Sequence, residues 1–242
     1  MTRRVTTNVT VRSPKITSPL TLAVLSDLHN GPYADVLAEV RGVDAILLAG
    51  DLLDRHDPGH TDNAAAFLQD APRVAPVFYA IGNHEWKSVD RPAFWPLVEK
   101  SDVTVLDNRL VSFGGINLGG LSSAARKDVD ARVVDDLARQ KGFSLLMCHH
   151  PEWYRRYIRG KGVDLTVSGH AHGGQVQVFG QGLYAPGQGL LPRLTNGFYE
   201  EGRLLVSRGV TNACRYPRWG NPCEIILLRL EPGEEYTYEI RA

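Results

Sequence analysis

The stretch Asp44-Ala45-Ile46-Leu47-Leu48-Ala49-Gly50-Asp51-Leu52-Leu53-Asp54 decides the fold of this chain. Its five apolar residues, 45–49, predict a strand that is buried on both faces. Asp51 is the first charged residue after that strand. In open α/β sheets ligands bind just outside the carboxyl ends of the strands. Asp51 is therefore placed where its two oxygens can contact two cations, although an aspartate there can also serve as a helix N-cap.

Four further apolar segments are followed by residues that can hold a metal ion. The segments are 20–25, 74–81, 143–148 and 163–167, and the residues after them are Asp27 and His29, Asn83 and His84, His149, and His170 and His172. Residues two apart in extended backbone point to the same side, so Asp-x-His and His-x-His can each grip one ion. Each segment alone is also compatible with a plain turn. The recurrence at five strand ends predicts two metal ions that clamp a phosphoryl group.

The remaining histidines and the cysteine next to this set receive other roles. His149 lies nearest its strand end, so we expect it, rather than His150, to be the ligand. His56 and His60 stand in a polar segment and are interpreted as solvated loop residues. Cys148 is predicted to face the core and is not a ligand. Because the ligand set mixes nitrogen and oxygen without thiolate, it suits manganese, iron or zinc.

The element pattern predicts an α/β fold with one domain over residues 1–242. We expect a first strand at 5–11 on a sheet edge, and short strands at 103–106, 109–113 and 116–118 that suit a second sheet. Further strands are predicted at 176–179, 203–207, 224–230 and 236–240, and helices at 34–41, 64–70, 91–100 and 128–140. Residues 180–197 predict a long loop over the active-site side. In the connections between the last strands, Arg208, Arg215 and Arg218 could bind a substrate phosphate, but solvated surface positions are favoured for them.

Composition excludes several function classes. The 27 basic and 27 acidic residues give a formal net charge of zero, which argues against a broad basic surface for nucleic acid. The sequence has no apolar run long enough to span a membrane, and no apolar segment follows Arg3 and Arg4 as in a signal peptide. The three cysteines form no Cys-x-x-Cys pair. We therefore expect a cytoplasmic protein.

The ordered set of motifs resembles the calcineurin-like metallophosphoesterases. The order is Asp-x-His, Gly-Asp-x-x-Asp, Gly-Asn-His-Glu, His and Gly-His-x-His, and it spans residues 25–175. The segments 168–175 and 221–225 look most like the bacterial branch of YkuE- and YaeI-like phosphodiesterases. Many members of that branch carry an N-terminal membrane anchor or export signal, which residues 1–11 do not predict. The resemblance implies a two-sheet β-sandwich flanked by helices, in agreement with the strand pattern.

The resemblance also implies a role for each residue of the set. Asp51 would bridge two divalent metal ions, and the acid or oxyanion-stabilising group would be His84. Asp54 or Glu85 would orient an imidazole from behind. A hydroxide bridging the metals would be the nucleophile. The first metal would be held by Asp27, His29 and His172, and the second by Asn83, His149 and His170.

These residues together predict a dinuclear metal-dependent phosphoesterase that acts on small-molecule phosphate esters, with diesters favoured. One alternative is a binding scaffold that kept the fold and lost the chemistry, although no ligand position is missing here. Another is a nuclease of the same fold, which the balanced charge does not support. The sequence selects no natural substrate among monoesters, diesters, cyclic nucleotides, pyrophosphates and lipid-linked esters, and it leaves the oligomeric state open.

Overall fold

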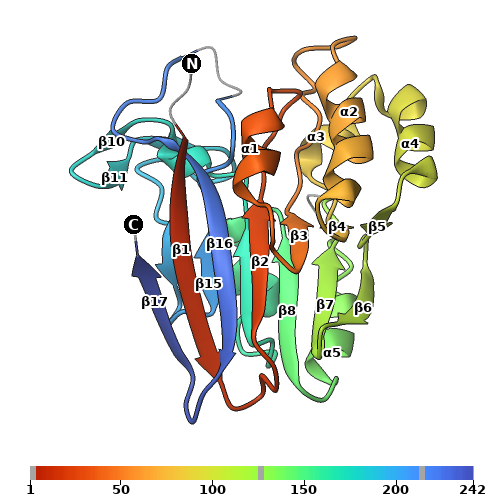
Figure 1. Cartoon of the computed structure of the whole chain (residues 1–242). Helices are drawn as coiled ribbons and strands as arrows, with labels where there is room; N and C mark the ends of the chain where they lie inside the picture. The colour runs from red at the N-terminus through yellow and green to blue at the C-terminus, as the bar shows by residue number, and fades with distance from the viewer. Residues whose placement is uncertain (1–3, 125–127, 213–215, 242) are drawn as a thin grey trace.

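The computed structural model describes residues 4–124, 128–212 and 216–241, and two β-sheets lie face to face at its centre (Figure 1). The first sheet has seven strands in the order β17-β1-β16-β2-β3-β4-β5. They are β1 (Arg4–Ser13), β2 (Leu20–Leu25), β3 (Ala45–Leu48), β4 (Val77–Tyr79), β5 (Val103–Val105), β16 (Cys223–Pro232) and β17 (Thr237–Arg241). The second has six strands in the order β14-β15-β9-β8-β7-β6. They are β6 (Arg109–Phe113), β7 (Ile116–Leu121), β8 (Phe143–Cys148), β9 (Leu165–Ser168), β14 (Gly197–Tyr199) and β15 (Leu204–Val206).

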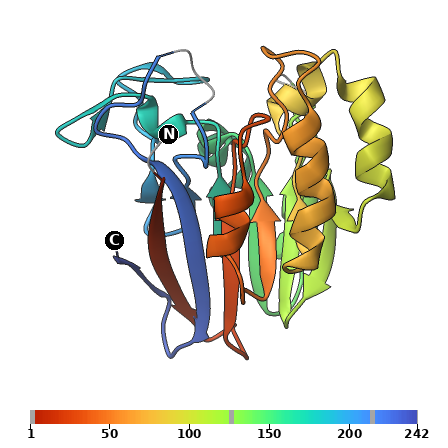
Figure 2. The same cartoon turned by 45° about the horizontal axis from the view of Figure 1, so that its top comes forward.

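Helices cover the outer faces of both sheets (Figures 1 and 2). They are α1 (Ala34–Glu39), α2 (Asp62–Asp70), α3 (Asn83–Lys87), α4 (Arg91–Lys100) and α5 (Arg132–Ala138). Short helical turns are η1 (Ala71–Arg73), η2 (Pro151–Trp153), η3 (Tyr154–Ile158) and η4 (His172–Gly174). Helices α1, α2 and α4 pack on the seven-stranded sheet, whereas α5 packs on β7 and β8 of the other sheet. The predicted two-sheet sandwich flanked by helices is confirmed.

Alternation along the strands explains the four layers. In β2, Leu22 and Val24 point into the core between the sheets, whereas Ala23 and Leu25 pack under the helices. In β8, Leu145 faces the shared core and Leu146 faces α5. Successive side chains of a strand point to opposite faces, so a strand covered on both sides must be apolar throughout. This is why the apolar runs in the sequence located the central strands.

The strands that precede the ligand-type residues run in the same direction within each sheet. Strands β2, β3 and β4 are mutually parallel, and so are β7, β8 and β9. Their carboxyl ends lie at the upper edge in Figure 1, beneath the long loops. Parallel strands with helical or long connections bring their carboxyl ends together, so residues distant in sequence meet at this edge.

Three sequence predictions about the elements are wrong. Strand β1 is not an edge strand, because β17 pairs with it on one side and β16 on the other. Strand β5 extends the first sheet by pairing with β4, rather than joining the second. The predicted helix over 128–140 is limited to α5. In addition, the short helix α3, which was not predicted, begins at Asn83. The pairing partner of a strand and the end of a helix depend on tertiary contacts that no local pattern encodes.

The predicted loop over 180–197 contains short paired segments. One hairpin joins β10 (Gln177–Val178) to β11 (Gln181–Gly182), and a second joins β12 (Tyr184–Ala185) to β13 (Gly189–Leu190). Both lie at the carboxyl edge of the sheets, as the loop prediction required. Among the helices of the described residues, none combines the length and apolar character needed to cross a bilayer. The assignment of residues 1–242 to one domain stays a prediction.

Candidate metal centre

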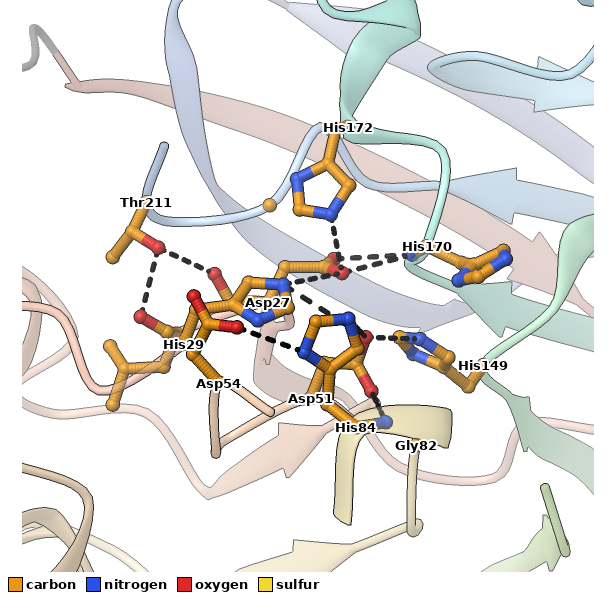
Figure 3. Close-up of polar contacts among 12 residues, drawn as sticks. Asp27, His29, Asp51, Asp54, Gly82, His84, His149, His170, His172 and Thr211 are labelled. Carbon is orange, nitrogen blue, oxygen red and sulfur yellow. Dashed lines mark hydrogen bonds and ion pairs between the residues drawn. The ribbon is translucent and has the colours of Figure 1, made fainter. Parts of the chain in front are cut away.

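Six of the seven predicted ligands converge at the carboxyl edge of the two sheets (Figure 3), and the seventh, Asn83, borders the same cleft. Asp27 and His29 follow β2, Asp51 follows β3, and Asn83 begins the helix after β4; His149, His170 and His172 follow β8 and β9. The structure places four groups of possible ligands in this region, and the ligand atoms of each group lie within 4.8 Å of one another. These groups are Asp27, His29 and His172; His29, Asp51 and His84; Asp51, His149 and His170; and His150, Glu152 and His170.

Asp51 lies at the centre of this arrangement. Its Oδ2 atom is 3.0 Å from Nε2 of His149 and 3.9 Å from Nε2 of both His29 and His84. Its other oxygen, Oδ1, accepts the backbone N–H of His84 at 2.8 Å. One oxygen therefore fixes the carboxylate to the start of α3, while the other faces three imidazoles. Asp51 is not the N-cap of a helix after its own strand, because the next helix after β3 is α2, which begins at Asp62, and the N-cap of α3 is Gly82.

The loops that bear the ligands are joined by hydrogen bonds between their backbones. The N–H of Asp27 donates to the carbonyl of Gly50 at 3.0 Å, and the N–H of His29 donates to the carbonyl of Asp51 at 3.1 Å. The N–H of His170 donates to the carboxylate of Asp27 at 3.2 Å. This last contact connects the two sheets directly, so the positions of the two ligand groups depend on each other.

Five of the seven predicted ligands have left-handed backbone conformations. Their φ angles lie between 47° and 66°, in Asp27, His29, Asp51, His170 and His172. This region costs a residue with a side chain roughly 1 kcal/mol or more. Such conformations persist where the surrounding structure fixes them, and they concentrate at functional sites. The sharp turns allow consecutive polar side chains to leave the strand ends toward one point.

The hydrogen bonds behind the imidazoles decide which nitrogen faces the site. Nδ1 of His149 lies 2.8 Å from the carbonyl oxygen of Ala49, so Nδ1 carries a proton and Nε2 is the nitrogen that faces Asp51. Nδ1 of His84 accepts the backbone N–H of Arg55 at 3.2 Å and lies 3.3 Å from Oδ1 of Asp54, which leaves its Nε2 on the side of Asp51. Asp54 thus contacts one imidazole of the site, and the resemblance implied that Asp54 or Glu85 would orient an imidazole.

Glu85 has a different task from the one suggested for it. Its carboxylate is buried and accepts the backbone N–H groups of Asp51, Leu53 and Gly82 at 3.2, 3.0 and 2.8 Å. It therefore ties the turn after β3 to the turn after β4. The interpretation of Glu85 as a residue that orients an imidazole is not supported by these contacts, since its partners are backbone amides.

Charge and burial act against each other at the carboxylates. Burial raises the pKa of Asp51, but the nearby His149 and His84 outweigh it and hold the pKa well below its usual range. Burial likewise raises the pKa of Asp27, and His172 and His29 bring it below the usual range. For His149, burial lowers the pKa, but Asp51 overcomes this effect and raises it to about 10. The carboxylates are ionised, and positive charge is strongly favoured beside them.

Buried polar atoms without hydrogen-bond partners indicate that the residues of this site can hold a cation. Among the seven predicted ligands, five buried atoms make no hydrogen bond of acceptable geometry, although Oδ2 of Asp51 and Nε2 of His149 lie 3.0 Å apart, and donors or acceptors in such positions are rare. They are Oδ2 of Asp51, Oδ1 of Asn83, Nε2 of His149 and both ring nitrogens of His29. A buried polar atom without a partner costs free energy of folding. Coordination to a divalent ion would give all of these atoms a partner.

Arg218 is a site residue that the sequence interpretation misplaced. Its guanidinium donates to the carbonyls of Arg208 and Thr211 at 2.6 Å each, and one Nη atom lies 3.2 Å from Nδ1 of His172. The prediction of a solvated surface position for Arg218 is therefore wrong. Burial lowers its pKa. Because the guanidinium can only donate, the proton of a neutral His172 lies on Nε2, and a metal bound there would displace it.

The other two arginines of that group differ from Arg218. Arg208 is half-buried and its backbone carbonyl is held by Arg218, whereas Arg215 lies outside the described residues. Thr211 is a further residue that sequence reasoning missed. Its hydroxyl lies within hydrogen-bond reach of the carbonyls of Asp27 and Leu28, at 2.9 and 2.8 Å (Figure 3). No local signal marks a threonine 184 residues away in sequence from the aspartate it contacts.

A cleft of about 500 Å³ opens above the ligands. The carboxylate of Asp51 and four of the histidines form its floor, and Arg55 and His56 border it from the loop after β3. Tyr184, Pro186 and Gly187 border it from the hairpin β12–β13.

His56, predicted as a solvated residue, has its ring 5.4 Å from that of His84, whereas His60 is exposed and paired with Asp57. Cys148 is buried in the core, as predicted.

The family model for calcineurin-like phosphoesterases matches residues 20–174, which include every ligand position described above. The chain belongs to this family. An uncharacterized metallophosphoesterase of Campylobacter jejuni is 30% identical to it over 241 residues, covering 93% of this chain and 62% of that protein. One of Helicobacter pylori is also 30% identical, covering 91% of this chain and 62% of that protein. The chain thus spans about 62% of the length of both relatives.

Solved structures share the fold at low sequence identity. The NAD nucleotidase of Haemophilus influenzae has a TM-score of 0.51 and 15% identity, covering 93% of this chain and 49% of that one. The sulfate thiohydrolase of Thermus thermophilus has a TM-score of 0.50 and 14% identity, covering 91% of this chain and 56% of that one. The narrower YkuE- and YaeI-like branch and a cytoplasmic location stay predictions.

Proposed function

We propose that this metallophosphoesterase uses two divalent metal ions to hydrolyse phosphodiesters. The observation that supports it best is the position of Asp51, whose Oδ2 faces His29 on one side and His149 on the other. A carboxylate shared by two ligand groups is suited to hold two ions a few ångströms apart. In this proposal Asp27, His29 and His172 would hold one ion, Asn83, His149 and His170 would hold the other, and Asp51 would serve both.

The bound ions would neutralise phosphate charge and activate water near neutral pH. The chain's own residues supply a proton for the departing alcohol and hold the proton donor in place. His84 lies at the cleft floor with Nε2 toward Asp51, so it can donate a proton to the departing alcohol oxygen. Asp54 behind it holds the ring in place through Nδ1. Manganese, iron and zinc all suit the nitrogen and oxygen donors of this site.

The charge of the cleft supports diesters over monoesters. Among the described residues that border it, Arg55 is the one basic side chain other than histidine. A monoester carries two negative charges at neutral pH and a diester carries one, so a monoester needs more cationic partners beyond the metals. The substrate proposed here is accordingly a small phosphodiester rather than a nucleic acid, since the chain's formal net charge of zero provides no broad basic surface.

The test is metal analysis and turnover of the purified chain with manganese. We expect about two ions per chain and faster hydrolysis of bis(4-nitrophenyl) phosphate than of 4-nitrophenyl phosphate. Asp51→Asn should lower metal content and reduce kcat by about 10³-fold or more. Asp57→Asn, in the exposed part of the same loop, is the matched control and should change neither.

Other results would favour the competing functions. A chain that binds no metal and turns over neither ester would be a scaffold that has lost the chemistry. Tight DNA binding that weakens steeply with salt, together with DNA cleavage, would favour the nuclease. Faster hydrolysis of the monoester would keep the metal mechanism and overturn the diester preference.

A further inference from the structure

Exposed apolar side chains gather on the loops beside the cleft. Of the twelve exposed large hydrophobic side chains among the described residues, eight lie between residues 178 and 219. That segment includes both hairpins, which stand above the carboxyl edge of the sheets (Figure 2). Scattered exposed hydrophobic residues are ordinary, but a gathering of them beside a polar cleft marks a binding surface.

The pairing of hairpin β12–β13 connects this surface to the cleft. Tyr184 pairs with Leu190, and Ala185 pairs with Gly189. Ala185 is fully buried in the core beneath, so the opposite face of the hairpin presents Tyr184 and Leu190. Directly opposed residues of antiparallel strands point to the same side. Tyr184 borders the cleft and is 53% exposed, and Leu190 beside it is 81% exposed, so the apolar wall continues outward from the cleft.

The hairpin is held against the metal centre rather than free of it. A Cβ atom on Gly187, at its tip, would lie 2.1 Å from Oε1 of Glu152, so the tip packs directly on that carboxylate. The same oxygen is 3.3 Å from Nδ1 of His150 and 3.9 Å from Nε2 of His170. At its base, the N–H of Leu191 donates to the carbonyl of Leu183 at 2.9 Å. The Tyr184–Leu190 face therefore has a fixed position relative to the cleft floor.

We propose that the Tyr184–Leu190 pair binds an apolar group of the substrate. This group belongs to the alcohol that remains esterified to the phosphate after hydrolysis. This inference rests on the proposed function and adds the substrate class: a phosphodiester that joins a charged centre to an alkyl or similarly apolar chain. The charged phosphate would lie on the cleft floor of histidines beside Asp51, while its apolar substituent covers the exposed Tyr184 and Leu190. Burial of that apolar surface would supply affinity.

The test compares a short and a long ligand that share one anionic group. Methylphosphonate and octylphosphonate would be titrated calorimetrically into the manganese-loaded chain below the concentration at which the octyl compound forms micelles. We expect the octyl compound to bind about tenfold more tightly or better, with a more negative heat-capacity change. Leu190→Ser should bring the ratio of the two affinities close to one. Leu97→Ser, an exposed leucine on α4 outside the cleft, should keep the wild-type ratio.

The outcomes separate this inference from the function on which it rests. Equal affinities in the wild-type chain would overturn the subsite, even if 4-nitrophenyl diesters are hydrolysed. Failure to hydrolyse methyl or octyl 4-nitrophenyl phosphate would overturn the proposed function, while the affinity ratio would still decide the subsite. Equal affinities combined with Leu190-dependent sedimentation on phosphatidylglycerol vesicles would show that the patch contacts a lipid surface instead, and would also overturn the inference.

Discussion

A Cβ atom on Gly82 would lie 2.2 Å from Oδ1 of Asp51. Gly82 has an ordinary extended conformation, with φ −88° and ψ −175°, so its backbone does not require glycine. The requirement comes from the close approach of the turn after β4 to the carboxylate. The missing side chain at position 82 therefore determines where Asp51 can lie.

The first prediction is that Gly82→Ala displaces Asp51 and lowers metal content. Manganese per chain, measured by elemental analysis after dialysis against dilute metal, should fall to half of the wild-type value or less. Gly42→Ala is the control, because Gly42 has φ +84° but nothing within 4 Å of an added Cβ. It should lose about 1 kcal/mol of unfolding free energy through backbone strain and keep its metal. Full metal content in Gly82→Ala would contradict the steric argument.

The second prediction concerns the His84–Asp54 pair. His84→Ala should lower kcat for the diester by about 10²–10⁴-fold with metal content retained, because it removes the proton donor and no proposed ligand. Asp54→Asn should lower kcat by about 10–100-fold through loss of the contact to Nδ1. His60→Ala, an exposed histidine in the same loop, serves as the control. A parallel loss of metal in His84→Ala would instead make His84 a ligand.

A third prediction tests the carboxylate beneath the site. Glu85→Gln should reduce the free energy of unfolding by about 2 kcal/mol, measured by urea denaturation, because an amide oxygen cannot accept all three backbone N–H groups that Glu85 now accepts. The exposed Glu99→Gln on α4 should change it by less than about 0.5 kcal/mol. Similar urea midpoints for the two variants would show that Glu85 does not stabilise these turns.

The fourth prediction is a pH effect at Tyr33, away from the metal centre. Burial, together with a hydrogen bond donated to Asp70 at 2.7 Å, raises the pKa of Tyr33 to about 12. The neutral phenol is therefore favoured in the folded state. Its stabilisation is complete below the unfolded pKa of about 10 and is lost as pH rises through about 12. In urea titrations the advantage of wild type over Tyr33→Phe should shrink between those pH values. An advantage that stays constant would exclude this linkage.

Much of the metal centre could be predicted from the sequence, because strand and ligand are adjacent in the chain. The apolar run before Asp51 identifies a buried strand, and the polar residue after it must emerge at the strand's carboxyl end. The same reasoning placed Asp27 and His149 at one edge, and the structure brings them together with Asp51. The roles of these residues as metal ligands stay predictions.

Tertiary structure alone decided the contacts that join distant parts of the chain. Thr211 reaches the carbonyl of Asp27, Arg218 reaches His172, and the Tyr184–Leu190 face reaches the cleft, all through loops without a periodic pattern. The edge of the first sheet was mispredicted for the same reason, since β17 joins β1 from the far end of the chain. Local sequence fixes which residues leave a strand end and in which direction. Which distant backbone then packs against them depends on the free energy of the whole fold, to which each segment contributes only a part.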